Sequence, residues 1–413
     1  MMKVESGEDI DNIIVPQRFI PFDIGTKITE QYVDDIKSYV EKKGYSVLEI
    51  PGLLRTISQH VLLRIIVNAS IKLYIFSYGI GVFVLEDNWY SMDEKYAAEY
   101  CEYRKKAHNN ILNFCHEGCS NVVKEVINDI RKIVKKEKNI RNSASDKWEY
   151  QGLSYVMTVS YVIKRNKSGN GYVDFDEIEK KNLHIMLQPS LAHKEDTMVM
   201  SEMEESNRGF DPYSFDVTHI DEPRNWLHTE DCSIYISWAA VVVYMKEKLD
   251  KYMEIIESLE VDLQAMWLYT YCQYINLKNW SDKKKLTSSQ LKKIKYNFQR
   301  RYNEFLSDND SSIPVYIEEI RGEMINSSGI EREKNNYMEY IDFCIDEIEG
   351  RELEQQRKYS VMNEVLLFII AFVQIAPMLY SAMLGEYNDL QLWPIIVMII
   401  LVVVAIFMII RKS

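Results

Sequence analysis

Val365 to Leu384 reads VLLFIIAFVQIAPMLYSAML, and Trp393 to Ile410 reads WPIIVMIILVVVAIFMII. Neither stretch carries a charged residue, and each approaches the roughly twenty apolar residues that a helix needs to cross a bilayer. Only GEYNDLQL, Gly385 to Leu392, separates them. The sequence therefore predicts a C-terminal hairpin of two transmembrane helices, over 365–384 and 393–410.

Basic residues flank this hairpin on one side only. Arg357-Lys358 precedes the first stretch and Arg411-Lys412 follows the second, whereas the loop holds Glu386 and Asp389. Since Lys and Arg are retained on the cytoplasmic side, both ends of the hairpin should be cytoplasmic. The N-terminal stretch MMKVESGEDIDNIIVP has no signal-peptide pattern, so we expect a multi-pass protein of the inner cell membrane with a cytoplasmic N-terminus.

Composition limits the function classes. The chain has 413 residues, of which 27% are charged, and a formal net charge of −13. A nucleic-acid binder needs a basic surface, so direct nucleic-acid binding is not expected. The 6 cysteines are scattered along the chain, which argues against a disulfide framework and fits a reducing compartment.

Residues 1–245 have the pattern of an α/β domain. Ile71 to Asp87 is rich in β-branched and aromatic residues and contains two glycines, which indicates two strands or one bulged strand. Tyr155 to Lys164 and Leu183 to Gln188 have strand character as well. Ser233 to Tyr244, SIYISWAAVVVY, is continuously apolar and is predicted to be one strand covered on both faces.

The pattern changes to helix over 246–360, which we interpret as a stalk. Helices are predicted over Glu247 to Asn279, over Ser288 to Leu306, and from about Ile330 into the first apolar stretch. The fold class predicted is therefore an α/β cytoplasmic domain (1–245), a long helical stalk (246–360) and a transmembrane hairpin (361–413).

The tail resembles the CorA family of magnesium channels. Asn363-Glu364-Val365 opens the first span, Pro377 lies two-thirds along it, Asn388 stands where that family's Gly-Met-Asn signature has its asparagine, and Trp393-Pro394 leads into the second span. The resemblance implies a homo-oligomeric pore of five subunits in the lipid bilayer, with Mg²⁺ as the permeant or regulatory ion.

The signature itself is changed, because Gly385-Glu386-Tyr387-Asn388 replaces Tyr-Gly-Met-Asn. In this respect, and in the segments YGIGVFVLE and SIYISWAAVVV, the chain looks like the divergent CorA-like membrane effectors of type III CRISPR systems. That resemblance implies antiviral defence by permeabilising the membrane, with an adenine-nucleotide second messenger as the ligand of the cytoplasmic domain. A divalent-cation transporter is the alternative reading.

Spacing and resemblance together give a set of candidate pore residues. Along the first span the residues Asn363, Ile370, Gln374, Pro377 and Ser381 are seven, four, three and four positions apart, so they share one stripe of a helix. Polar groups in lipid should face other helices or water. Glu386 and Asp389 in the loop would be repeated in rings at the pore mouth, where carboxylates concentrate cations. The candidates are Asn363, Ile370, Gln374, Ser381, Glu386 and Asn388.

An anionic ligand has three candidate regions. In Thr218 to Asp231 the side chains of Arg224, Trp226 and His228 combine charge, a stacking surface and a titratable ring, although a polar loop with a packed tryptophan is the simpler interpretation. Arg131 to Arg141 and Lys283 to Arg301 are basic, and the second of these could instead contact anionic headgroups.

The stalk helix carries the acidic residues Glu339, Asp342, Asp346, Glu347 and Glu349, which either bind regulatory Mg²⁺ between subunits or form a solvated face.

Catalytic motifs are missing from the sequence. The chain contains no GxxxxGK[ST], HExxH or GxSxG pattern, so we do not expect an enzyme. A membrane-tethered nuclease using His219, Asp221 and His228 is the minor alternative.

Overall fold

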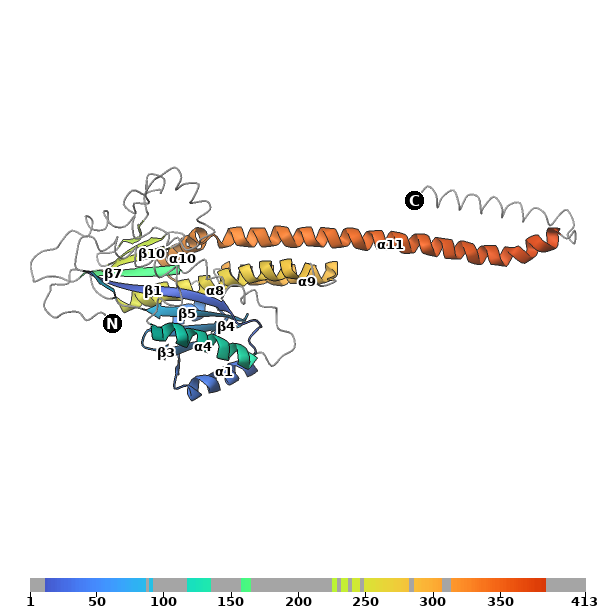
Figure 1. Cartoon of the computed structure of the whole chain (residues 1–413). Helices are drawn as coiled ribbons and strands as arrows, with labels where there is room; N and C mark the ends of the chain where they lie inside the picture. Colours follow the sequence, from blue (N-terminus) through green and yellow to red (C-terminus); the bar gives the residue numbers. More distant parts are fainter. Residues whose placement is uncertain are drawn as a thin grey trace, which may run out of the picture. The chain divides into compact units, whose positions relative to one another are not determined.

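The computed structural model describes residues 12–86, 89–91, 117–134, 157–164, 225–228, 232–236, 240–245, 249–281, 286–306 and 313–383 (Figure 1). The chain divides into two compact units. We call residues 1–284 with 295–340 the body, and residues 285–294 with 341–413 the stem.

One mixed sheet forms the centre of the body. Its strand order is β2-β3-β4-β5-β1-β7-β10-β9-β8, and β6 also pairs with β1. The β7–β10 pair is parallel, whereas the other neighbouring strands are antiparallel. The strands are β1 (Asn12–Asp23), β2 (Ser46–Leu48), β3 (Val61–Asn68), β4 (Ile71–Phe76), β5 (Ile80–Glu86), β6 (Trp89–Ser91), β7 (Met157–Lys164), β8 (Asn225–His228), β9 (Cys232–Ile236) and β10 (Ala240–Met245).

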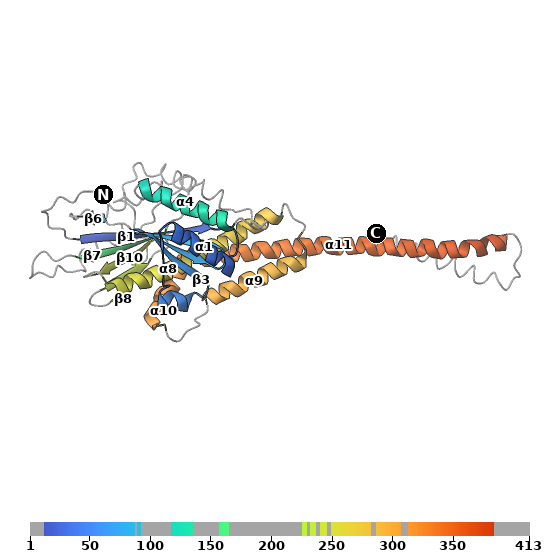
Figure 2. The same ribbon diagram turned by 90° about the horizontal axis from the view of Figure 1, so that it is seen from below.

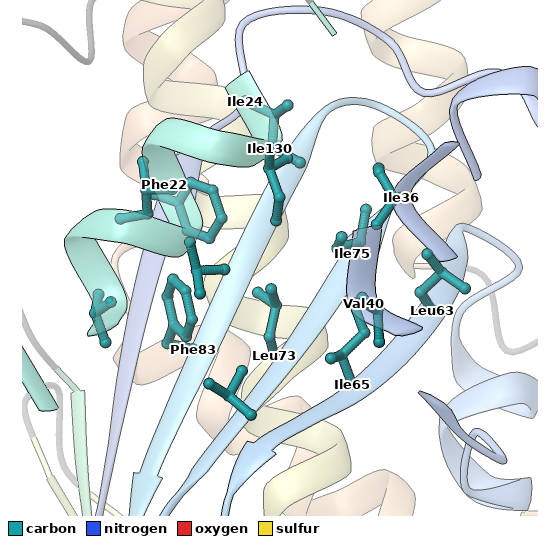
Figure 3. Close-up of a cluster of buried hydrophobic side chains, with 14 of the residues drawn as sticks. Phe22, Ile24, Ile36, Val40, Leu63, Ile65, Leu73, Ile75, Phe83 and Ile130 are labelled. Atoms are coloured by element: carbon teal, nitrogen blue, oxygen red, sulfur yellow. The ribbon is translucent and has the colours of Figure 1, made fainter. Parts of the chain in front are cut away.

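Helices cover both faces of this sheet, which explains why strands such as β5 and β10 are apolar on both sides. Helices α1 (Glu30–Lys42) and α4 (Glu117–Val134) lie on one face, and Figure 2 views the body from that side. Helix α8 (Asp250–Ser281) packs on β1 and β5. Figure 3 shows the core between the sheet and α1 and α4, where Ile36, Val40 and Ile130 face Leu63, Ile65, Leu73 and Ile75.

The turn between β4 and β5 requires its glycines. Gly79 has φ 86°, and a Cβ there would lie 2.0 Å from the carbonyl oxygen of Thr26. A Cβ on Gly81 would lie 2.4 Å from the ring of Phe22, which stacks on Phe83 with 5.2 Å between ring centroids. Of the two alternatives for Ile71 to Asp87, two strands or one bulged strand, the first is confirmed, because β4 and β5 pair as separate antiparallel strands.

The remaining helices are α2 (Gly52–Ile57), α9 (Ser288–Leu306), α10 (Val315–Ser327) and α11 (Ile330–Met383). Helices α8, α9 and α11 confirm the predicted helical segments. The prediction of one strand over Ser233 to Tyr244 is wrong, because β9 and β10 are separate antiparallel strands paired through Val241 and Ile236. Both strands are buried, so each is apolar on both faces. Their combined sequence therefore has the same continuous apolar pattern as a single long buried strand.

The coarse fold class is confirmed as an α/β sheet domain followed by a long, partly apolar helix. Helix α11 contains the predicted first span almost to its end at Leu384. The predicted second span over 393–410, its connecting loop and the predicted strand Leu183 to Gln188 lie outside the described residues.

Candidate functional site

Apolar side chains are exposed all round α11 between Val361 and Val373. Leu367 is 65% exposed and Val373 is 62% exposed. Consecutive residues of a helix point about 100° apart, so the exposed positions Val365, Leu366, Leu367, Ile369, Ile370, Phe372 and Val373 leave no polar face. Within the described residues, α11 alone is long and apolar enough to cross a membrane, and its most apolar window is not buried by protein.

The structure places three of the six candidate pore residues by their side chains. Asn363, Ile370 and Gln374 are exposed on α11 and share a stripe, because seven and four residues are close to whole turns. Ser381 lies in α11, but its side chain is not described, and Glu386 and Asn388 lie outside the described residues. Their role in a pore stays a prediction.

The stem holds the start of α9 against α11. Ser288 Oγ donates to Glu352 Oε2 at 3.2 Å, and Lys292 Nζ lies 2.5 Å from Glu349 Oε1. Glu352 also lies beside the N-terminus of α9, where the helix dipole favours negative charge. Two contacts therefore fix α9 to the polar part of α11, before the apolar segment begins.

The acidic residues of the predicted stalk are mostly engaged in such pairs or exposed. Glu347 pairs with Arg351, and Glu349 pairs with Lys292. In the described part of the chain, no group of three or more His, Cys, Asp or Glu side chains is placed to hold a metal ion. A magnesium site shared between subunits stays a prediction.

All three candidate ligand regions are described only in part. Trp226 and His228 lie on β8, but their side chains are not described, and Arg224, His219 and Asp221 lie outside the described residues. Arg131 is buried and donates through Nε and Nη2 to the carbonyl oxygen of Asp23, at 3.1 and 2.7 Å. Arg131 therefore attaches α4 to the end of β1 and is not displayed for a ligand, while residues 135–141 lie outside the described residues.

A buried polar network that the sequence did not reveal joins α8 to the sheet. Glu257 accepts hydrogen bonds from Tyr74 Oη at 2.6 Å, Lys72 Nζ at 2.7 Å and Gln17 Nε2 at 3.1 Å. Tyr161 Oη donates to Gln17 Oε1 at 3.2 Å. Desolvation, with the nearby Glu257 charge, raises the pKa values of Tyr74 and Tyr161 above their usual range. Both hydroxyls therefore stay protonated and act as donors. The network fixes the position of α8.

A second polar feature is a cavity of about 30 Å³ at the junction of α8, α9 and the turn before β3. Its polar walls come from Ser58, His60, Tyr78, Asp262, Arg301 and Glu304, and its apolar walls from Ile57, Met266 and Phe305. The cavity lies wholly within the body. Some of its lining side chains carry buried polar atoms that have no hydrogen-bond partner among the described residues.

Two such atoms are Asp262 Oδ2 and Tyr78 Oη. Asp262 is 4% exposed and Tyr78 is 2% exposed. Ser58 hydrogen-bonds the Asp262 carboxylate, and Arg321 Nη2 lies 3.8 Å from Oδ2, which is beyond hydrogen-bond distance. Desolvation raises the pKa of Asp262 to about 6, although Arg321 opposes that rise. At neutral pH the lining of the cavity therefore includes a carboxylate that is mostly ionised and has one oxygen without a hydrogen bond.

His60 and Arg301 also line the cavity. His60 Nδ1 lies 3.0 Å from Ser77 Oγ, and Nε2 lies 3.4 Å from Glu304 Oε2. Desolvation lowers the pKa of His60 despite Glu304, so the ring is neutral at pH 7. Arg301 donates to Tyr269 Oη at 3.2 Å and supplies a fixed positive charge at the cavity.

Comparison of the chain with protein-family models, with curated proteins and with solved structures gives no match. The functional assignment therefore depends on the geometry of this chain and on the resemblance of its tail.

Proposed function

We propose that this chain is a CorA-like membrane channel of type III CRISPR defence, opened by an adenine-nucleotide messenger bound to its α/β body. The observation that carries this proposal is the segment of α11 with exposed apolar side chains on every side. A helix of that kind is stable inside lipid or a large apolar core, and the described body leaves this segment uncovered.

The continuity of α11 supports a coupling role for it. The helix begins at Ile330 in the body and continues to Met383, and Pro377 falls inside its apolar part. A ligand that changes the body can therefore act on the membrane segment through one unbroken helix. In this proposal Asn363, Ile370 and Gln374 line the pore of a homo-oligomer.

The energy required of the ligand is moderate. Moving a gate from about 1% to 99% open takes roughly 5.5 kcal/mol of preference for the open state. In an oligomer of five identical subunits, each bound nucleotide supplies only about 1 kcal/mol of that sum. A modest rearrangement in each body is sufficient.

Reconstitution of the full chain into liposomes tests the proposal. We expect no ion flux without nucleotide, and flux after addition of adenine oligonucleotides made by a type III CRISPR complex. A divalent-cation transporter would instead carry Mg²⁺ without nucleotide and rescue a magnesium-transport-deficient strain. That result, without any nucleotide response, would replace the proposal with the transporter function.

A further inference from the structure

Helix α9 belongs to both units of the chain. Its first two turns, Ser288 to Ile294, are in the stem, and the rest of the helix from Lys295 is in the body. In the body α9 packs on α11 through aromatic rings, because Phe298 and Tyr337 lie 4.4 Å apart between centroids and both are buried. Helix α9 is therefore a second helical connection between the two units, besides α11.

The first two turns of α9 hold α11 at two polar positions. Ser288 donates to the Glu352 carboxylate, through its N–H at 3.4 Å and its Oγ at 3.2 Å. Lys292 Nζ lies 2.5 Å from Glu349 Oε1, and Leu291 beside it is 1% exposed. The contacts are four residues apart on α9 and three apart on α11, which is about one turn of each helix. The two helices therefore face each other here in an antiparallel arrangement.

This is also where α9 stops covering α11. Every side chain that the structure describes from Leu353 to Asn363 is exposed. Glu352 is nine residues before Val361, where the exposed apolar side chains begin, and nine residues of helix are about 14 Å long. The contact with Ser288 is thus the last restraint that α9 places on α11 before the apolar segment.

A contact favours the state of the protein in which it forms. The chain makes these contacts by itself, and a channel of the proposed kind has to be closed when only the chain is present. The restraint is also breakable, since the Lys292 and Glu349 side chains are 60% and 38% exposed. An exposed ion pair shifts an equilibrium by about two- to fivefold. In an oligomer of five that opens as one unit these factors multiply, so even twofold per subunit becomes about 30-fold.

We propose that the first two turns of α9 form an autoinhibitory contact with Glu349 and Glu352, which holds α11 in the closed state. The inference rests on the proposed function in that the chain is a gated channel, but it does not depend on which ligand opens the gate. Opening then separates the start of α9 from α11, while the aromatic packing of Phe298 and Tyr337 in the body is retained.

Ion flux from liposomes that contain the full chain, measured without nucleotide, tests this contact. Lys292→Glu places two like charges together and should raise the flux at least about tenfold over wild type, because the loss is repeated in every subunit. Glu349→Lys should do the same. The double variant Lys292→Glu/Glu349→Lys restores an ion pair with the charges exchanged, so its flux should return to within about twofold of wild type.

The matched control is Arg351→Glu, which reverses a charge on the same part of α11 but disturbs a pair with Glu347 inside that helix. It should stay as closed as wild type. Silent Lys292→Glu and Glu349→Lys proteins of normal oligomer size on gel filtration would overturn the inference, and so would a leak that the double variant does not correct. The response of wild type to nucleotide is measured separately. Leaky single variants beside a wild type that ignores nucleotide would retain this contact and refute the proposed ligand, whereas silent variants beside a nucleotide-opened wild type would refute the contact alone.

Discussion

Glu260→Gln tests whether α8 carries a buried carboxyl that is protonated at neutral pH. Glu260 is 0% exposed. Its Oε1 accepts from Gln264 Nε2 at 2.7 Å, while Oε2 has no hydrogen-bond partner among the described residues. Desolvation raises its pKa from 4.5 to about 8, and the contact with Gln264 only partly opposes this. The side chain is therefore neutral in the folded protein at pH 7 and ionised in the unfolded chain.

The sign of the pH dependence follows from the raised pKa. Between pH 4.5 and about 8 the folded state holds more protons at this site than the unfolded state, so stability falls as pH rises. With these two pKa values, the loss is about 1 kcal/mol at pH 5 and about 3 kcal/mol at pH 7. Glutamine is neutral at both pH values and has no such loss. The stability difference between variant and wild type should therefore grow by about 2 kcal/mol from pH 5 to pH 7.

Urea unfolding of the full chain in a mild detergent measures this difference, with the fluorescence of its 7 tryptophans as the signal. The pH dependence of stability that comes from the other titrating groups cancels in this difference, because those groups are the same in both proteins. Glu354→Gln is the matched control, since Glu354 is exposed and Lys358 lowers its pKa through a hydrogen bond; its difference should change little over this range. An equal gap between Glu260→Gln and wild type at both pH values would refute the argument.

Four further outcomes are expected. Val373→Arg places a charge in the apolar segment at a cost of about 2.5 to 3.5 kcal/mol and should lower the membrane-bound fraction on cell fractionation, whereas Gln355→Arg in the polar part of α11 should not. Gly79→Ala should lower the thermal unfolding midpoint, because its Cβ meets Thr26 at a positive φ, with a loss of about 1 to 3 kcal/mol. Gln374→Ala should change single-channel conductance without changing oligomer size on gel filtration; unchanged conductance would exclude it from the pore. A cysteine placed in the loop 385–392 should react with an impermeant thiol reagent from outside intact cells, and labelling at the C-terminus instead would contradict the hairpin.

Local signals in the sequence were sufficient for α8, α9 and α11. Helix α9 begins at Ser288. Thr287, the residue before it, forms a capping box with Gln290: the Thr287 N–H donates to Gln290 Oε1 at 3.0 Å, and the Gln290 N–H donates to Thr287 Oγ1 at 3.3 Å. The β4–β5 turn was likewise marked by its glycines. In both cases the determining residues are only a few positions apart, which is the range over which sequence patterns are informative.

The errors arose where local signals were missing. The link between β9 and β10 is Ser237-Trp238-Ala239, which contains neither glycine nor proline, so the two strands have the pattern of one. The Glu257 network joins α8 to Gln17, 240 residues earlier, and Asp262 meets the turn at Ser58. Pairings over such distances depend on the strand order, which periodicity does not encode.

The buried carboxyls of α8 differ in how well their charge is compensated. Glu257 accepts three hydrogen bonds from donors on the sheet, so its charge is compensated, and removing one donor would leave part of it unsatisfied. Asp262 has an oxygen without a hydrogen-bond partner among the described residues, so its burial adds an unfavourable term to the folded state. The same helix thus combines a well-satisfied attachment to the sheet with a neighbouring carboxylate whose burial lowers stability.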